Sequence, residues 1–243
     1  MNRLIRTFIE PTHHQVGEEI NLSENEAIHL SRVLRLQKGD CLEALDGRGR
    51  RYSSECIEMN RARIKIRIME VHQEKPALRE VRMAIALGKS NKWEEMIRPL
   101  TELGVNRLTP LITQRTEAAF DLRKLRDKKI RWQKIAQEAC KQSGNAWVPR
   151  FDDPLRFSDA VPKLAEKEEC WIGSLTILGD KLNPLCNSDR LAIFIGPEGG
   201  WSPEEERSAK LSGFNFFTLG SNVLRVETAA VSALAVARQN KFC

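Results

Sequence analysis

The sequence predicts an α/β protein in which a small, barrel-like β domain precedes a domain built on a parallel β-sheet. Three observations support this prediction. Residues 62–71, ARIKIRIMEV, alternate apolar and polar side chains with period 2, as a half-buried strand does. From residue 81 onward, apolar strand-like runs alternate with helical patterns, which is typical of a parallel sheet covered on both faces. The polar segment HQEKPALRE, residues 72–80, separates the two patterns, so we predict domains at 1–72 and 81–243 joined by a linker at 73–80.

The first domain is predicted to be mostly β with one helix. Residues 23–36 open with Ser23, and Glu26 follows three residues later, which is the capping-box pattern of a helix start. Residues 41–57 contain two strand candidates on either side of an Asp-Gly pair, which indicates a hairpin.

The second domain is predicted to alternate strands and helices. Gly104 and Gly213 stand where helices are expected to end, and Ser202 with Pro203 stands at a helix start. The last helix is apolar almost all round, so we expect it to be buried in its own core or in an interface. In chain order, strands are predicted at 81–87, 107–113, 169–175, 190–196 and 214–220, and helices at 92–104, 121–142, 157–167, 202–213 and 226–240.

Composition and failed motifs exclude several classes of protein. No run of 18 apolar residues is present and the N-terminus has no apolar signal-peptide core, so we expect a soluble, cytoplasmic protein. The six cysteines form no Cys-x-x-Cys pair and the four histidines all lie in the first 72 residues, so we expect no disulfide framework and no metal site. ALGKS at 86–90 lacks the first glycine of a P-loop, and GRGRRY at 47–52 fails the dinucleotide fingerprint.

The formal net charge of +6 is concentrated in the middle of the chain. Residues 76–150 contain 16 basic and 8 acidic side chains, a net charge of +8, whereas residues 151–243 contain 10 and 13, a net charge of −3. A basic region of this kind favours a face that binds nucleic acid. The alternative is a solvated basic helix, because residues 121–134 supply much of the excess.

Two loops carry the strongest functional signal. GPEGGW, residues 196–201, and LGSNVLRVE, residues 219–227, each follow an apolar strand and precede a helix. In an open parallel sheet, ligands bind beyond the carboxyl ends of the strands, and glycine lets the backbone approach them closely. The two loops are therefore predicted to form one pocket whose backbone groups read a ligand such as an adenine ring. Two tight strand–helix turns without a ligand remain the alternative.

IGPEGGWSPEE followed by LGSNVLRVETAA strongly resembles the SPOUT methyltransferases, and specifically the ribosomal RNA small subunit methyltransferase E family. The segments HLSRVLRLQKGD, DGRGRRY, GKSNKWEEMIRPLTELGV and RWQKIAQEACKQS also agree, so the resemblance extends over nearly the whole chain in order. It implies a PUA-like β domain before a SPOUT domain with a trefoil knot, and a homodimer. It also implies methylation of N3 of one uridine in the decoding region of 16S rRNA, on the assembled small ribosomal subunit, with S-adenosylmethionine (SAM) as cofactor and no metal.

Site residues follow from the loops and from the resemblance. Arg225 is predicted to stabilise a uridine anion, and Glu198 or Glu227 to orient the base or take its proton, since no His or Tyr lies in the second domain. Cations on the hairpin tip, with one aromatic ring, are predicted to meet RNA phosphates and a base. The predicted SAM-binding residues are Gly196, Pro197, Glu198, Gly199, Gly200, Leu219, Gly220, Val223, Leu224, Arg225, Val226 and Thr228. The predicted RNA-binding residues are Arg32, Arg35, Arg48, Arg50, Arg51, Tyr52, Lys89, Lys92 and Arg115.

The sequence departs from the family pattern at Gln114, within Gln-Arg-Thr, and at Asn145. Two other functions stay open at this level. One is a SPOUT methyltransferase of another specificity, acting on a ribose 2′-hydroxyl or on tRNA. The other is a non-catalytic RNA-binding assembly factor that retains the fold.

Overall fold

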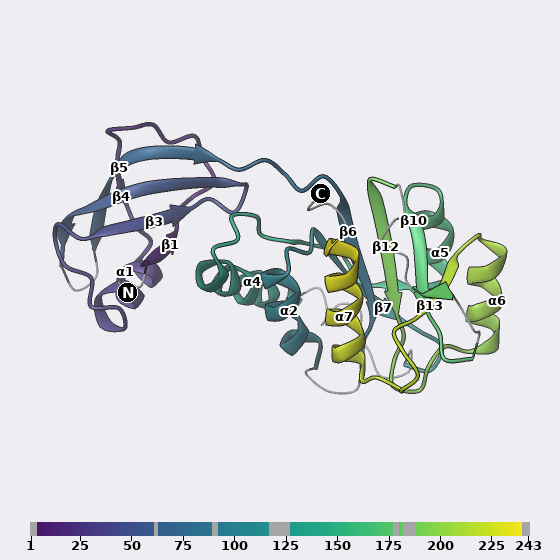
Figure 1. Cartoon of the computed structure of the whole chain (residues 1–243). Helices are drawn as coiled ribbons and strands as arrows, with labels where there is room; N and C mark the ends of the chain where they lie inside the picture. Colours follow the sequence, from purple (N-terminus) through teal and green to yellow (C-terminus); the bar gives the residue numbers. More distant parts are fainter. Residues whose placement is uncertain are drawn as a thin grey trace. The chain divides into compact units, whose positions relative to one another are not determined.

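The computed structural model describes residues 4–60, 63–88, 92–116, 127–176, 180–181 and 188–239. Contacts divide the chain into two compact units (Figure 1). The first contains Met1–Pro76 together with Gln137–Val148, and the second contains Ala77–Ala136 together with Pro149–Cys243. The boundary at 76 lies within the predicted linker, whereas the assignment of residues 137–148 to the first unit was not predicted.

The first unit contains a five-stranded sheet in the order β1-β3-β4-β5-β2, with one helix, α1. β1 pairs with β3 in parallel, and the other pairs are antiparallel. The predicted helix and hairpin are confirmed, while the three-residue strands β1 and β2 were not predicted. The bounds are β1 Arg6–Phe8, β2 Glu19–Asn21, α1 Glu24–Arg32, β3 Cys41–Leu45, β4 Arg50–Met59 and β5 Ile64–Gln73.

Only half of the predicted capping box forms at the start of α1. The Ser23 hydroxyl accepts a hydrogen bond from the Glu26 backbone N–H at 3.4 Å. The Glu26 carboxylate instead accepts hydrogen bonds from the Thr7 hydroxyl at 2.6 Å and from Lys141 Nζ at 2.8 Å. Tertiary partners have therefore replaced the local partner that the sequence pattern indicated.

Residues 144–148 lie against the β3–β4 hairpin within the first unit. Gly49 has φ +91°, and a Cβ atom at this position would lie 2.2 Å from the Trp147 ring, so only glycine fits beneath the indole. The Gly49 N–H donates to the Ala146 carbonyl at 2.9 Å. Asn145, one of the family departures, accepts a hydrogen bond from the Trp147 N–H at 2.9 Å and so closes the local turn.

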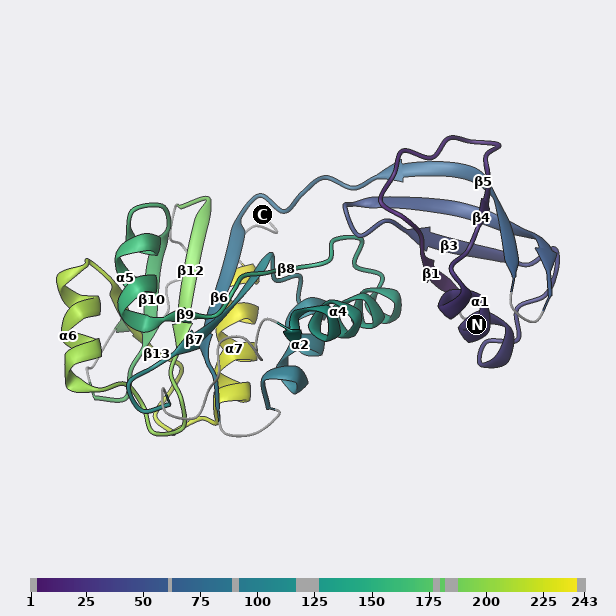
Figure 2. The ribbon, with the colours of Figure 1, turned by 180° about the vertical axis from the view of Figure 1, so that it is seen from behind.

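The second unit contains a parallel sheet whose main order is β11-β13-β10-β12-β6-β7-β8, with β9 paired to β7. Helices α2 and α7 cover one face and α5 and α6 the other (Figures 1 and 2). The predicted parallel sheet with helices on both faces is thus confirmed. The helix α4, Lys129–Ser143, begins in the second unit and ends in the first. The other bounds are β6 Glu80–Ala86, α2 Lys92–Glu102, β7 Arg107–Ile112, β8 Arg150–Phe151, β9 Leu155–Arg156, α5 Phe157–Ala165, β10 Glu169–Gly173, β11 Asp180–Lys181, β12 Arg190–Ile195, α6 Pro203–Leu211, β13 Asn215–Thr218 and α7 Val226–Arg238.

The core between the sheet and α5 and α6 is rich in aromatic side chains. Phe194, on the central strand β12, lies 4.8 Å from Phe214 and 6.1 Å from Phe157 between ring centroids. Trp201, in the loop after β12, lies 4.8 Å from Phe157. This packing fixes the position of the β12–α6 loop, which carries the GPEGG motif.

The described part of the predicted helix 121–142 is α4, and its predicted residues 121–126 lie outside the described residues. The two-residue strands β8, β9 and β11 were not predicted, because so short a run carries no periodicity. No helix in the described ranges is long and apolar enough to cross a membrane.

Candidate active site

Loops after five strands of the second unit lie at one edge of its sheet. β6, β7, β10, β12 and β13 are mutually parallel neighbours, so their carboxyl ends point to the same edge. In open parallel sheets this edge is where ligands bind. Both loops singled out in the sequence, 196–201 and 219–225, belong to it.

The first turn of α6 holds three of these loops together. Glu205 accepts hydrogen bonds from the Gln114 N–H after β7 and from the Ser202 N–H after β12, each at 2.8 Å. Glu206 accepts a hydrogen bond from the Ser174 hydroxyl after β10 at 2.6 Å. Carboxylates at a helix N-terminus are also favoured by the helix dipole, so this turn is a well-stabilised support for the site. Gln114, the other family departure, uses its backbone here.

The GPEGGW loop contains glycines with different roles. A Cβ atom at Gly196 would lie 3.0 Å from the Trp201 ring, whose Nε1 donates to the Gly173 carbonyl at 2.8 Å. Gly200 has φ +72°, and its N–H closes a turn on the Pro197 carbonyl at 2.8 Å. Packing and turn geometry therefore account for these two glycines. Gly199 is exposed, so its backbone is open to a ligand.

Charged side chains surround this loop. Lys92, in the first turn of α2, forms an ion pair with Glu198 at 3.1 Å. A Cβ atom at Gly88, after β6, would lie 3.2 Å from a Glu198 carboxylate oxygen, so the β6 and β12 loops are in contact. Arg115 lies against Gly199, where an added Cβ would be 3.4 Å from its Cδ. Glu198, Lys92 and Arg115 thus share one end of the site.

The second loop places Arg225 at the N-cap of α7. Its side chain is exposed and has no hydrogen-bond or ion-pair partner among the described residues, Glu227 included. A cation at a helix N-terminus faces the positive end of the helix dipole, which disfavours it by about 0.3–1 kcal/mol. Glu227, two residues into α7, has one carboxylate oxygen that is buried without a hydrogen-bond partner. Both features are unfavourable for the isolated chain and favour a bound ligand at this position.

The structure brings all the predicted SAM-binding residues to this edge, in the β12–α6 loop, the β13–α7 loop and the first turn of α7. Of the predicted RNA-binding residues, Lys92 and Arg115 lie at the same edge, whereas Lys89 lies outside the described residues. Sequence reasoning missed the support from Glu205, Glu206 and Trp201. Only Glu205 had a local signal, as the third residue after the N-cap Ser202.

The remaining RNA-binding predictions fall in the first unit and need two corrections. Tyr52 is fully buried in the β-domain core, so its ring is not available to stack on a base. Arg51 pairs with Glu43 at 3.1 Å and with Glu74, and it donates to the Gly144 carbonyl, which makes it part of the packing of residues 144–148. Tyr52 and Arg51 lie within β4 and not on the hairpin tip. Arg32, Arg35 and Arg48 are exposed, and Arg50 is half-buried.

Comparison with known proteins identifies the family. A family model described as an RNA methyltransferase domain matches residues 73–238, and one described as an RNA methyltransferase PUA domain matches residues 22–69. Ribosomal RNA small subunit methyltransferase E of Synechocystis sp. is 35% identical over 221 residues, which cover 89% of this chain and 71% of the relative. The chain belongs to the ribosomal RNA small subunit methyltransferase E family. The Bacillus subtilis member is 29% identical over 242 residues, covering 95% of this chain and 94% of the relative.

Solved structures with the same fold carry a cofactor. A methyltransferase of Legionella pneumophila, solved in complex with SAM, is 30% identical, covers 97% of both chains and has a TM-score of 0.86. The ribosomal RNA small subunit methyltransferase E of Neisseria gonorrhoeae, bound to SAM, is 26% identical, covers 96% of both chains and also has a TM-score of 0.86. The described part of this chain contains no cluster of His, Cys, Asp and Glu able to hold a metal ion.

Proposed function

We propose that this protein transfers the methyl group of SAM to N3 of a specific uridine in the decoding region of 16S rRNA, on the assembled small subunit and in the cytoplasm. The observation that carries the proposal is Arg225, which is exposed and has no partner among the described residues. It ends one of the two glycine-containing loops at the carboxyl edge of the sheet, in a chain that belongs to this family. Incubation of unmethylated small subunits with labelled SAM should place the label on one uridine N3. Label on a ribose, on tRNA or nowhere would contradict the proposal.

The residues present fit SAM. Gly199 and Gly220 are exposed, so backbone groups of both loops are accessible to an adenine and a ribose. The unpartnered oxygen of Glu227 is an acceptor suited to a hydroxyl or ammonium donor of the cofactor. Leu219, Leu224 and Val226 supply apolar contacts at the end of β13 and the start of α7. Bound SAM would supply an already activated methyl group, so the protein needs no metal and no covalent nucleophile.

The protein's own residues must then position the uridine and handle its charge. The N3 proton has to leave before N3 attacks, and the negative charge that develops spreads over O2 and O4 of the ring. Arg225 cannot lose its proton near neutral pH, so it acts as a fixed electrostatic partner for these oxygens. Glu198 is the proposed acceptor or orienting group. It forms an ion pair with Lys92 at 3.1 Å, which places its carboxylate at this end of the site.

Gly199→Val is expected to abolish SAM binding in titration calorimetry while the circular dichroism spectrum stays unchanged, because the new side chain would occupy the cofactor's approach to the backbone. Gly199→Ala is the milder control. The valine could block SAM directly or could displace Arg115, which lies beside Gly199. The double variant Gly199→Val/Arg115→Ala distinguishes these two causes. Recovery of binding in the double variant would mean that the valine acts through Arg115, and unchanged affinity in Gly199→Val would overturn the assignment.

A homodimer and a trefoil knot stay predictions. For the dimer we propose α7 as the interface, because only one side of this apolar helix is fully buried within its own chain. Val231 lies on the half-buried side. Val231→Glu is expected to convert a dimer into a monomer at micromolar concentration in analytical ultracentrifugation. Leu211→Glu, at a highly exposed apolar position on α6, should leave the mass unchanged. A wild-type monomer at that concentration would contradict the dimer.

A further inference from the structure

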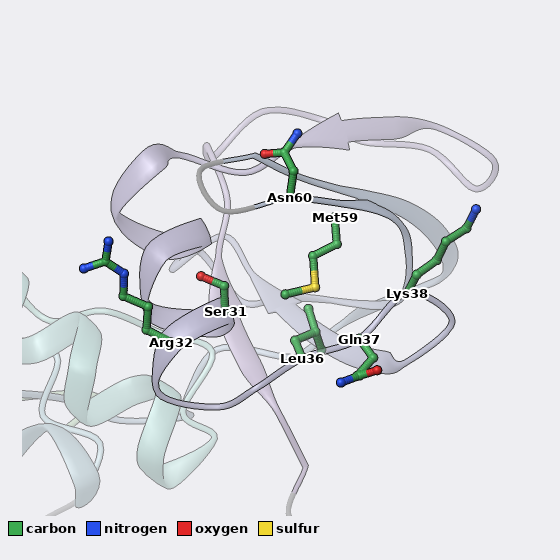
Figure 3. Close-up of a pocket in the computed structure, with 7 residues that line it drawn as sticks. All are labelled: Ser31, Arg32, Leu36, Gln37, Lys38, Met59 and Asn60. Carbon is green, nitrogen blue, oxygen red and sulfur yellow. The ribbon is translucent and has the colours of Figure 1, made fainter.

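A hollow in the first unit lies outside the site described above. It has a volume of about 660 Å³ and is bounded by the end of α1, the turn that follows it and the end of β4 (Figure 3). Small-molecule sites have volumes of about 300–1,000 Å³, so the hollow is in the range that holds a nucleotide. Its lining residues are Ser31, Arg32, Leu36, Gln37, Lys38, Met59 and Asn60.

The interior of the hollow combines an apolar floor with amide groups. Leu36 is 1% exposed, and Met59 packs against the core of the β domain. In Figure 3 the Met59 side chain lies between those of Ser31 and Leu36. Gln37 and Asn60 carry amides at the margin, and amides pair with the donor and acceptor groups on a base edge.

Three cations around the hollow have no carboxylate partner among the described residues. Arg32 and Lys38 line it, extending on opposite sides in Figure 3, and Arg63 flanks it through backbone hydrogen bonds to Asn60. None of these three side chains has a carboxylate partner among the described residues, and Arg32 and Lys38 are exposed. Several other cations of this unit do have carboxylate partners, namely Arg6, Arg51, Lys65, Arg67 and Lys141, whereas Arg48 and Lys75 have none among the described residues.

The backbone beside the hollow is unusual. Arg35, between Arg32 and Leu36, has φ +52° and is the one non-glycine residue with positive φ in the described part of the chain. A bulky residue in this conformation is uncommon and is often found at functional sites. Arg35 lies in the turn that joins Arg32, at the end of α1, to Leu36 and Lys38, which also line the hollow.

We propose that this hollow binds one unpaired nucleotide of RNA, with the base over Met59, its edge at Gln37 and Asn60, and the backbone phosphates on its two sides at Arg32 and at Lys38. Sequence-specific RNA recognition commonly uses splayed-out bases, on aromatic rings or on arginine planes. The residues that line the hollow include no aromatic ring, so Met59 takes that place. The inference rests on the proposed function in that the RNA is the methylation substrate. It adds a second contact point within the β domain.

The direct test is a titration of the full-length protein with uridine 5′-monophosphate, followed through the Met59 methyl and the Gln37 and Asn60 side-chain amide resonances. Movement of all three at millimolar nucleotide is the expected result. Inorganic phosphate is the comparison and should leave the Met59 methyl unmoved. Equal shifts with phosphate alone, or no shifts with either, would overturn the proposal. This titration measures nucleotide binding and requires neither SAM nor methylation. Failure of the proposed reaction can therefore be distinguished from failure of the nucleotide site.

Charge reversal gives the second test, with a short single-stranded RNA as probe. The double variant Arg32→Glu/Lys38→Glu should weaken binding and reduce the slope of log affinity against log salt by about 1.4, or roughly 0.7 for each lost phosphate contact. Lys163→Glu/Lys167→Glu changes the net charge equally at exposed positions near the amino end of β10 and should keep the wild-type slope. SAM affinity should be the same in both variants. If both pairs weaken RNA binding alike, or if duplex RNA shows the same loss as the single strand, no nucleotide site exists there.

Discussion

Replacing Arg225 with alanine is expected to slow single-turnover methylation of small-subunit RNA by a factor of about 10²–10³, the cost of losing one preorganised donor to a developing anion. The Arg225 side chain makes no hydrogen bond or ion pair with any described residue that would indicate a structural role. It stands exposed at the α7 N-cap without a partner, at the helix end where a cation is disfavoured. Structural roles for an arginine normally involve a carboxylate or a carbonyl, as Arg51 and Arg82 illustrate. We therefore assign Arg225 to the uridine ring.

Affinity for SAM should change much less than the rate. Arg225→Lys is the informative control, because it keeps the charge but loses the planar fork of donors, and we expect an intermediate rate. The wild-type rate should rise toward alkaline pH as the uridine N3 proton becomes easier to remove. No histidine-like inflection is expected, since all four histidines lie in the first 72 residues. A variant that loses SAM binding but keeps its turnover at saturating SAM would place Arg225 in the cofactor loop.

The sequence predicted those elements whose signals are local. The five longer strands of the second unit, β6, β7, β10, β12 and β13, are apolar runs of four to seven residues bounded by turn signals. Their predicted ranges agree with the structure to within about two residues, the usual scatter at element ends. The α6 N-terminus was equally readable, because Ser202, Pro203 and Glu205 each have a known preference for their position.

Predictions failed where distant partners decide the outcome. The Glu26 carboxylate accepts hydrogen bonds from Thr7 and Lys141 and not from the backbone at the start of its own helix. The residues around Glu26 in the sequence give no sign that Lys141 lies beside it. Residues 137–148 belong with the β domain because Trp147 packs over Gly49, a contact between segments about a hundred residues apart. Tyr52 is different, since a local signal existed. Tyr52, Ser54 and Cys56 are all buried at alternate positions of β4, as expected for a strand with one face in the core. The arginines of GRGRRY drew the interpretation toward an exposed RNA-binding tip, so this alternation was not used.

The same distinction applies to the candidate site. The two glycine loops were found from their place between strand and helix, because glycine and strand ends are visible in sequence. Their mutual support was not predictable. Glu206 contacts Ser174, and Glu205 contacts Gln114, only because the parallel order places β10 and β7 on either side of the β12–β6 pair.

A buried ionic network near the amino end of the same sheet gives the last prediction. Arg82, on β6, is 7% exposed and pairs with Glu168 at 2.6 Å and with Asp152. Arg107 donates to Asp152 at 2.7 Å, and the Thr109 hydroxyl does so at 2.6 Å. Burial opposes ionisation of Asp152, but the hydrogen bonds from Thr109 and Arg107 and the nearby cations prevail and lower its pKa.

Arg82→Met should destabilise the protein by about 3–5 kcal/mol in urea unfolding, because removing one partner of a buried ion pair leaves uncompensated charge. Arg131→Met, which breaks the pair between the highly exposed Arg131 and Glu94, should cost only about 0–1 kcal/mol. The triple variant Arg82→Met/Asp152→Asn/Glu168→Gln removes the stranded charges and should recover much of the loss. If the triple variant is as unstable as Arg82→Met, packing around the arginine stem is responsible and not the charge.

The pH dependence follows from the lowered pKa of Asp152. A carboxylate whose pKa is lower in the folded state stabilises the fold above its ordinary pKa, and this contribution is lost as pH falls through the folded value. The wild type should therefore lose stability on acidification more steeply than Arg82→Met, in which Arg82 no longer holds Asp152 ionised. The difference between the two should shrink from neutral pH toward acid. SAM affinity of the folded variant should match the wild type, because the network contacts no described residue of the loops at the carboxyl edge. An unfolding free-energy difference that stays constant with pH would show that Asp152 is not coupled to Arg82.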